Sequence, residues 1–266
     1  MKKVNITKEK LTELYTEKKL TMYEIAEIYN VDRSTIGNKL KAYGICSNPS
    51  KRKFYHLKAI PLTQQQKELI VGSALGDASI IKRNTISYFK VSHCERQKEY
   101  LMWKKEILGN FVNVVNKYAD KRGNSIMYSF NTLGLSELNS FRDMFYNNNK
   151  KTIKEEISDS LTTFGLAVWY MDDGSKQNNS CRLSTDGFSK DENIVLQKVL
   201  KSKFDLDCKV CGYTRNNKEY YFLSFNKNNT IKLHNMIKDY VVNCMKYKLI
   251  DCSSTTTCQN SDNSIV

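Results

Sequence analysis

Two aspartates lie 96 positions apart in this chain (173 − 77), and each ends a short apolar stretch with helical character. Asp77 follows the run Ile70-Val-Gly-Ser-Ala-Leu-Gly, and Asp173 follows the run Leu166-Ala-Val-Trp-Tyr-Met-Asp. A buried helix that ends in an aspartate delivers that side chain to a fixed place. Two carboxylates held a few Å apart repel each other unless hard cations sit between them, and Mg²⁺ prefers oxygen ligands. The pair therefore predicts a site for divalent metal ions.

A lysine recurs in register with each acid. Lys151 lies 74 positions after Asp77 (151 − 77), and Lys248 lies 75 positions after Asp173 (248 − 173). A duplicated unit of this size predicts two similar halves packed as a pseudo-dimer. Each half would then contribute one aspartate and one lysine to a shared centre.

The elements around the two acids repeat as well. After each acid the pattern predicts two strands, a helix, further strands and a helix, and a helix begins 18 positions after each aspartate, at Glu95 and Asp191. The strand-like runs are 86–92, 126–132, 181–184, 208–213 and 220–225. The helix-like runs are 95–112, 135–146, 191–204 and 227–241.

The two apolar patterns resemble the paired signature of the LAGLIDADG homing endonucleases, and on that signature Asp77 and Asp173 take the same slot. The second copy is similar to the form found in two-motif monomers of that family. Further matches are Asn149-Lys-Lys-Thr-Ile153, Leu183-Ser-Thr-Asp-Gly-Phe188 and Met245-Lys-Tyr-Lys-Leu249, so the resemblance spans about residues 62 to 250. Two positions depart from it: Ala78 replaces the motif glycine, and Val168 stands where the first copy has Gly72.

The resemblance implies an α/β (α+β) fold with two pseudo-symmetric αββαββα halves, residues 62–152 and 153–252. It implies a monomeric, site-specific endonuclease that cuts double-stranded DNA at a long recognition site with Mg²⁺ (or Mn²⁺) and serves intron homing. The catalytic residues carried over by position are Asp77, Asp173, Lys151 and Lys248, the lysines stabilising phosphate charge or tuning the attacking water. The expected metal ligands are Asp77, Asp173, Gly76 and Asp172, the last through its backbone carbonyl.

In that fold the two motif helices pack side by side, which requires small residues where the backbones approach. Gly72 and Gly76 supply one such face in the first copy. We expect the bulky Trp169 and Tyr170 of the second copy to fill the space beside Ser73 and Ala74.

Composition indicates the class of partner. The chain of 266 residues has 40% hydrophobic residues, a formal net charge of +14 and a pI near 9.3. Such a balance allows real hydrophobic cores and favours a polyanionic partner, most simply nucleic acid. No stretch approaches the roughly 20 apolar residues of a membrane span, and Met1-Lys-Lys leads into a charged helix. We therefore expect a protein that is not secreted, either cytoplasmic (bacterial or phage-encoded) or organellar, with no membrane and no obligate protein partner.

The first 58 residues hold 13 Lys/Arg against 6 Asp/Glu, a net charge of +7 (13 − 6). Helical spacing of Leu11, Leu14, Ile25, Ile28, Ile36 and Leu40 predicts a small all-α domain over 1–45, with Thr21 and Asp32 as N-caps. Its small-apolar-apolar pattern resembles a helix-turn-helix, whose exposed face would enter a DNA major groove. A three-helix packing module without DNA contact is the alternative. The DNA-contacting residues expected here are Arg33, Ser34, Thr35, Asn38 and Lys39.

A basic linker over 46–61 and a disordered tail over 253–266 are expected to flank the two halves. Within the halves, the expected DNA contacts are Lys82, Arg83, Lys90, Arg182 and Arg215. Cys208 and Cys211 have zinc-ligand spacing, but they fall in a strand-like run, so free thiols are favoured.

Two further functions remain open at the level of sequence. A DNA-binding transcription regulator that has lost catalysis would keep the same scaffold. An intron RNA-splicing maturase would keep the fold and even the acids, and its partner would be intron RNA.

Overall fold

The computed structural model describes residues 6–18, 20–45, 57, 60–120 and 125–250. The chain divides into two compact units, Met1–Ile60 and Pro61–Val266. Apart from residues 57, 60 and 61, the expected linker lies outside the described residues, and so does the whole of the expected tail. Among the described helices, none combines the length and the apolar character needed to cross a membrane.

The first unit is a small helical domain with a core of its own. It contains α1 (Lys8–Thr12), the π-helical turn η1 (Glu13–Glu17), α2 (Met22–Ile28) and α3 (Arg33–Ala42). Thr21 forms a capping box with Glu24, and the Asp32 side chain accepts from the Ser34 N–H, so both expected N-caps are present. Ile28 ends α2 as the helical spacing predicts, although its side chain is 59% exposed. The core residues are Ile6, Leu11, Leu14, Tyr15, Met22, Ile25, Ala26, Ile36 and Leu40.

The second unit repeats one arrangement twice. The first half runs α5 (Gln64–Leu75), β1 (Ser79–Arg83), β2 (Ile86–Cys94), α6 (Lys98–Leu108), β3 (Val112–Ala119), β4 (Ile126–Thr132) and α7 (Leu138–Phe145). The second half runs α9 (Thr163–Asp173), β7 (Gly174–Gln177), β8 (Ser180–Leu183), α10 (Lys190–Phe204), β9 (Lys209–Arg215), β10 (Lys218–Phe225) and α11 (Lys227–Ile237). The sheets have equivalent antiparallel orders, β1-β2-β4-β3 and β7-β8-β10-β9. The predicted fold class of two αββαββα halves is confirmed.

Shorter elements connect these parts. The hairpin of β5 (Tyr146–Asn147) and β6 (Lys150–Lys151) and the helix α8 (Ile157–Ser160) join the two halves. Single 3-10 turns η3 (Glu95–Gln97) and η4 (Gly109–Phe111) flank α6, and η5 (Lys238–Tyr240) and η6 (Asn243–Lys248) follow α11. The helix expected over 95–112 is therefore shorter, and Gly109 ends it with a positive φ of 54°.

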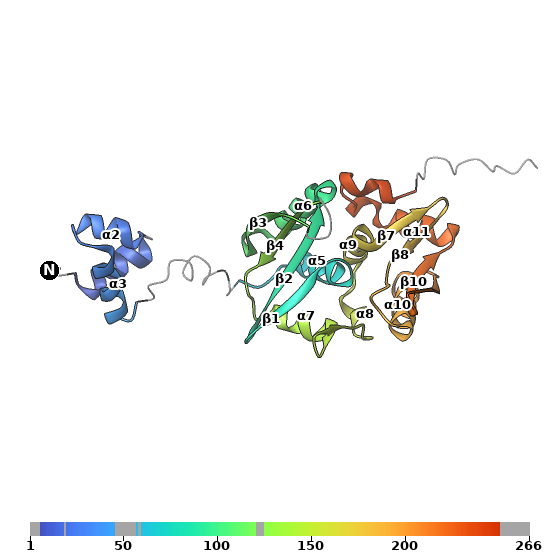
Figure 1. The fold of residues 1–266 in the computed structure, drawn as a ribbon, viewed down its shortest axis with the longest axis horizontal. Coiled ribbons are helices and arrows are strands. Elements are labelled where there is room, and N and C mark those ends of the chain that lie inside the picture. The colour runs from blue at the N-terminus through green and yellow to red at the C-terminus, as the bar shows by residue number, and fades with distance from the viewer. Residues whose placement is uncertain (1–5, 19, 46–56, 58–59, 121–124, 251–266) are drawn as a thin grey trace, which may run out of the picture. The chain divides into compact units, whose positions relative to one another are not determined.

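The motif helices α5 and α9 pack against each other between the two sheets (Figure 1). Thr63 begins α5 with a capping box to Gln66, and Thr162 caps α9. A Cβ on Gly72 would lie 2.2 Å from the carbonyl oxygen of Gly165 and 2.8 Å from the Cβ of Val168. Only a glycine lets the two backbones approach this closely. Gly72 therefore allows α5 to pack directly against α9.

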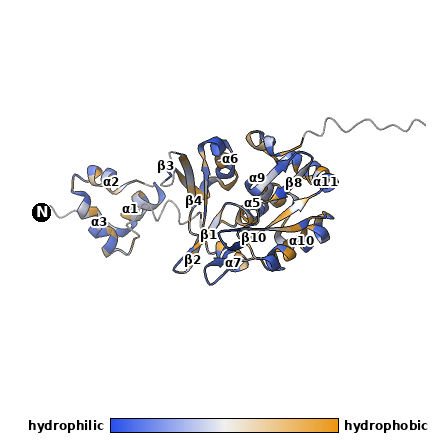
Figure 2. Ribbon diagram, turned by 45° about the vertical axis from the view of Figure 1, so that its right-hand side comes forward, coloured by the Kyte–Doolittle hydropathy of each residue, from blue (hydrophilic) through white to orange (hydrophobic). Residues whose placement is uncertain are grey.

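Each sheet has one buried and one solvent-facing side. In β2, Phe89 and Val91 are buried against the helices, while Lys90 between them is exposed. The same alternation gives β8 its buried Cys181 and Leu183. Hydrophilic and hydrophobic residues alternate along α6 and α10 in Figure 2, as expected for helices that bury one face.

Candidate active site

Asp77 lies just after the end of α5, and its side chain is 42% exposed. Its backbone N–H donates to Oδ2 of Asp172 on α9 at 3.3 Å. The side chain of Asp77 also approaches His93, whose Nδ1 lies 3.6 Å from Oδ2 of Asp77. The first motif acid is thus accessible to solvent and is fixed at its backbone by the other half.

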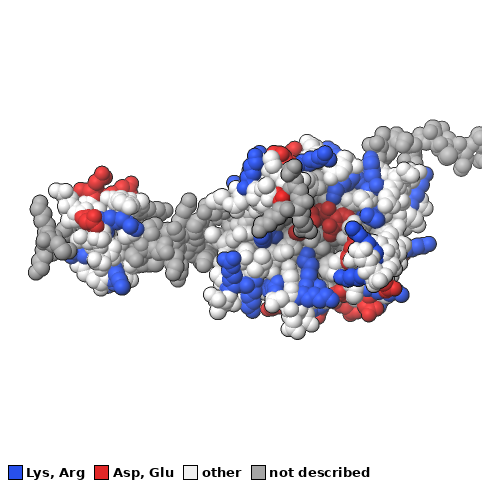
Figure 3. All heavy atoms as spheres, in the orientation of Figure 1, with Lys and Arg blue, Asp and Glu red and all other residues white. Residues whose placement is uncertain are grey.

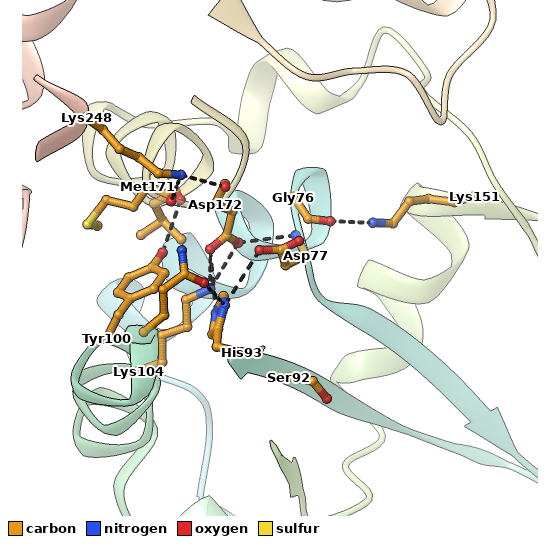
Figure 4. Close-up of polar contacts among 12 residues, drawn as sticks. Gly76, Asp77, Ser92, His93, Tyr100, Lys104, Lys151, Met171, Asp172 and Lys248 are labelled. Atoms are coloured by element: carbon orange, nitrogen blue, oxygen red, sulfur yellow. Dashed lines mark hydrogen bonds and ion pairs between the residues drawn. The ribbon is translucent and has the colours of Figure 1, made fainter. Parts of the chain in front are cut away.

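Of the two acids labelled in Figure 4, Asp172 has more polar partners than Asp77. Its carboxylate has no exposed surface and accepts two hydrogen bonds from Lys104 Nζ, at 2.7 and 3.0 Å. Its Oδ1 lies 3.8 Å from Nε2 of His93, and its backbone carbonyl accepts from Lys248 at 2.8 Å. Asp172 therefore links the first half of the unit to the second.

The sequence did not single out Lys104, Tyr100 or His93 as partners of the acids. Lys104 and Tyr100 are fully buried on α6, and the Lys104 ammonium lies 4.4 Å from the centre of the Tyr100 ring. The Tyr100 hydroxyl donates to the carbonyl of Val168 on α9 at 3.2 Å. One signal was available: Lys104 lies at helical spacing between Tyr100 or Leu101 and Leu108, on the apolar face that α6 buries.

Both predicted lysines hold the backbone beside a motif acid. Lys151 Nζ donates to the carbonyl oxygens of Gly76 and Ala78, each at 3.0 Å. Lys248 Nζ donates to the carbonyl oxygens of Met171 and Asp172. Each lysine thus contacts the residue that precedes its motif acid, which reproduces the duplication in space. The carbonyls of Gly76 and Asp172, expected as metal ligands, have lysine partners in this structure.

Burial and mutual repulsion change the acidity of the motif acids. Burial, and then the neighbouring Asp172 and Asp77, raise the pKa of Asp173 to about 8. Burial and the charge of Asp172 also raise the pKa of Asp77. Burial lowers the pKa of Lys151 and Lys248, while the acids act in the opposite direction. Ionised Asp77, Asp172 and Asp173 repel one another in this partly buried centre, and a cation bound between the carboxylates would relieve that repulsion.

Asp77, His93 and Asp172 form a group that could hold a metal ion, because one ligand atom of each lies within 4.8 Å of the others. His93 is 2% exposed, and its Nε2 lacks a hydrogen-bond partner among the described residues. Burial, and next the charge of Lys104, lower the pKa of His93 to about 4, so the ring is neutral at pH 7. Lys104, which donates to both carboxylate oxygens of Asp172, competes with any metal ion for that carboxylate.

The solvent-facing sides of the two sheets carry basic and aromatic residues. Strand register puts Arg83, Tyr88 and Lys90 on one side of the first sheet, with the Arg83 guanidinium 5.1 Å from the centre of the Tyr88 ring. Lys82 was also expected as a DNA contact. Its side chain lies on the opposite side of the sheet from Arg83, the side of the buried Ile80, and it is exposed near the end of β1.

In the second sheet the pairing of β8, β9 and β10 places Arg182 and Arg215 on one side. Arg182 lies 5.3 Å from the centre of the Phe222 ring, and Tyr213 and Tyr220 stack with ring centroids 5.4 Å apart. Figure 3 shows Lys and Arg side chains on both halves of the second unit. The exposed faces therefore suit a polyanion.

The expectation that Tyr170 fills the space beside Ser73 and Ala74 was wrong. Its hydroxyl donates to the carbonyl of Lys248 at 3.0 Å and lies 2.7 Å from His234 Nε2, so the ring points into its own half rather than toward Ser73 and Ala74. Val168 is the large residue that faces Gly72. Trp169 is fully buried, as expected for a core aromatic.

In the first unit, the residues expected to contact DNA lie on α3. Arg33, Ser34 and Asn38 are exposed, and Thr35 and Lys39 are half-buried. Arg33 lies 5.1 Å from the centre of the Tyr23 ring, and that ring is 67% exposed. The five side chains therefore lie on one helix and present accessible polar groups. This arrangement is compatible both with a DNA-binding helix-turn-helix and with a three-helix packing module.

Comparison with known proteins identifies relatives along most of the second unit. The chain is 31% identical to the DNA endonuclease I-ChuI of Chlamydomonas applanata over 71% of this chain and 96% of that protein. It is 29% identical to the cytochrome b mRNA maturase bI2 of Debaryomyces hansenii, over 71% of this chain and 75% of the relative. The solved structure of the homing endonuclease I-WcaI bound to its DNA recognition sequence matches with a TM-score of 0.66 and 26% identity, over 77% of this chain and 93% of that one.

A family model described as the LAGLIDADG DNA endonuclease family matches residues 67–233, which include most of α5, all of α9 and both four-stranded sheets. The first unit lies outside that match. The duplicated αββαββα fold, the paired motif helices and these relatives agree with the resemblance seen in the sequence. The chain therefore belongs to the LAGLIDADG DNA endonuclease family.

Proposed function

We propose that this protein is a site-specific endonuclease that hydrolyses both strands of a DNA duplex with divalent metal ions. The observation that carries the proposal is that the ends of the two motif helices meet. The Asp77 N–H donates to Asp172, the neighbour of Asp173, and Lys151 and Lys248 each hold the carbonyl that precedes one motif acid. Family membership supports a nuclease, and the relative I-WcaI is described as bound to its DNA recognition sequence.

Asp77 and Asp173 are the proposed ligands of Mg²⁺ or Mn²⁺. The donor set fits hard cations, because it consists of carboxylate oxygens. Burial, and then repulsion by Asp172, raise the pKa of both acids, and a bound cation would offset that repulsion. A bound divalent cation supplies an activated water and stabilises the leaving oxygen of a phosphodiester. The neutral His93 ring beside Asp77 is a further donor, and it would favour Mn²⁺ over Mg²⁺ if it took part.

The lysines are proposed to act on charge at the phosphate. Their hydrogen bonds to the carbonyls beside each acid hold both ammonium groups next to the carboxylates. A positive group in that position stabilises negative charge that develops on phosphate oxygens. Lys151 and Lys248 would each serve the half-site of their own motif acid.

The solvent-facing sides of the two sheets are proposed to lie along the DNA. Arg83, Lys90, Arg182 and Arg215 share these faces with aromatic rings, and guanidinium groups suit both phosphate and base edges. Lys82, at the end of β1, is proposed to contact phosphate only. Arg33, Ser34, Thr35, Asn38 and Lys39 of the first unit are proposed to extend the contact with DNA.

Cleavage of a library of duplex targets by the purified protein, with and without Mg²⁺, tests the proposal directly. We expect cutting at one long site, abolished in Asp77→Asn and Asp173→Asn while DNA affinity stays within about tenfold. Asp159→Asn, an exposed acid on α8, serves as the matched control. Wild-type rates in either motif variant would disprove the assignment of the acids.

A maturase is the second candidate, because one relative carries that description. Binding and splicing of intron RNA by the same preparation would test it. RNA splicing that persists in Asp77→Asn, with no DNA cut by the wild type, would favour the maturase over the endonuclease.

A further inference from the structure

A buried lysine pairs with a buried acid across the boundary between the two halves. Lys104 on α6 belongs to the first half and Asp172 on α9 to the second, and neither side chain has any exposed surface. Removing one partner of such a pair leaves a buried charge without a partner and is strongly destabilising, whereas an apolar pair of similar volume is often as stable as the ion pair. Stability alone therefore does not explain why the pair is ionic.

The pair has no counterpart on the other side of the pseudo-twofold axis. The spacing of 96 between the motif acids relates Tyr100 to Leu196 and Lys104 to Leu200 (100 + 96 and 104 + 96), and both leucines are fully buried in α10. The residue equivalent to Asp172 is Gly76 (172 − 96). The polar residues thus surround one half-site only, and apolar residues fill the equivalent positions of the other.

The carboxylate held by Lys104 acts on the backbone of a motif acid. Oδ2 of Asp172 accepts from Lys104 at 3.0 Å and from the Asp77 N–H at 3.3 Å. Tyr100 adds a second link from α6 to α9 through the Val168 carbonyl. A carboxylate accepting several donors at once has little freedom to rotate, so its orientation fixes the place where Asp77 leaves α5.

We propose that Lys104 is a positioning residue that acts through Asp172 to set the backbone of Asp77, and that it makes the two half-sites unequal. This inference rests on the proposed endonuclease function, since the consequence is a different rate of cutting for each DNA strand. The Asp172 carboxylate is then a brace between the halves, and Asp173 holds the metal.

Amide hydrogen exchange in the free protein tests the brace without DNA or metal. The variants are Lys104→Met, which leaves one buried charge, and Lys104→Met/Asp172→Asn, which leaves none. We expect exchange at the Asp77 amide to accelerate about tenfold in both. The Ser184 amide, which donates to the Asp173 carbonyl at 3.0 Å in the other half, is the internal control and should change less than about threefold in the double variant.

Strand-resolved cleavage in a single turnover tests the consequence. The double variant should regain most of the melting temperature that Lys104→Met loses, yet still cut one strand about tenfold more slowly, with DNA affinity within about threefold. Lys67→Met, which removes a lysine from the half-exposed pair with Glu137, should leave both strand rates unchanged.

The two measurements distinguish the possible failures. Unchanged exchange at the Asp77 amide overturns the brace, whatever the activity. Equal slowing of both strands, or no slowing, overturns the inequality of the half-sites. A wild type that cuts no DNA removes the proposed function, while accelerated exchange at Asp77 would still support the brace.

Discussion

Gly76 at the end of α5 faces Asp172 on α9, and a Cβ on Gly76 would lie 2.5 Å from the Cβ of Asp172. These residues occupy equivalent positions in the two motif copies (172 − 76 = 96). One copy carries no side chain there, and the other fills the vacated space with a carboxylate. The pseudo-twofold axis therefore relates two backbones but not two identical surfaces.

Gly76→Ala should disturb the centre because the added methyl group overlaps Asp172. Overpacking of this kind costs about 1–3 kcal/mol, and here relief requires moving a residue with three polar partners. We expect a lower melting temperature and slower cleavage, measured by calorimetry and single-turnover assays. Gly187→Ala is the control, because a Cβ there meets nothing within 4 Å. A variant at Gly76 as stable and active as the wild type would contradict the close approach.

Asp173→Asn should stabilise the metal-free protein at neutral and alkaline pH. The folded-state pKa of Asp173 is raised to about 8, above its ordinary value of 3.8, so the folded protein retains a proton that the unfolded chain has released. Stability contributed by this group is fully present below about pH 4 and is lost as pH rises toward 8. The difference in melting temperature between variant and wild type should therefore grow over that range.

Added Mg²⁺ should raise the melting temperature of the wild type more than that of Asp173→Asn, because the variant has lost one of the two proposed carboxylate ligands. The same measurement on Asp159→Asn gives the response of an exposed acid on α8. For the pH prediction above, a difference in melting temperature between Asp173→Asn and the wild type that shrinks with rising pH would refute the raised pKa of Asp173.

Lys151→Ala and Lys248→Ala should slow cleavage without abolishing it, each chiefly on one strand. Each substitution removes a positive charge and two hydrogen bonds to carbonyls beside one motif acid. Strand-resolved kinetics on end-labelled duplex measures the effect. Lys150→Ala and Lys246→Ala, exposed neighbours in sequence, provide the matched controls. Equal losses on both strands would argue against one lysine for each half-site.

Sequence spacing predicted two similar halves, each with one aspartate and one lysine, and hydrophobic periodicity predicted the approximate order of helices and strands, because both patterns act locally along the chain. The αββαββα fold of each half was predicted from the family resemblance. Strands β1, β3 and β7 belong to the predicted order of elements but had no predicted bounds, because they are short or carry mixed polar residues. The repeated Asp–Lys spacing was sufficient although Lys151 lies in β6 and Lys248 at the end of η6, because each lysine follows the last long helix of its half.

The asymmetry of the site could not be predicted in the same way. Asp172 pairs with Lys104, 68 positions away and in the other half, and a periodicity argument contains no information on such a partner. His93 was visible as an isolated histidine, but its approach to both Asp77 and Asp172 depends on the register of β2 within its sheet. Contacts across the pseudo-twofold axis are properties of the packed halves, which a reading of each half alone does not contain.

Deletion of residues 1–60 should weaken DNA binding and flatten its salt dependence while the bonds cut stay the same. The first unit has its own core, and it carries Arg33 and Lys39 on α3, while the four proposed catalytic residues lie after Pro61. Each phosphate that the truncated protein no longer neutralises should reduce the log-log slope of affinity against salt by about one. Side-by-side footprinting, salt titration and cleavage mapping of full-length and truncated protein measure the three quantities, with Arg33→Ala/Lys39→Ala in the full chain as the matched variant. An unchanged footprint and slope would identify the first unit as a packing module, and a displaced cut would place part of the catalytic machinery before Pro61.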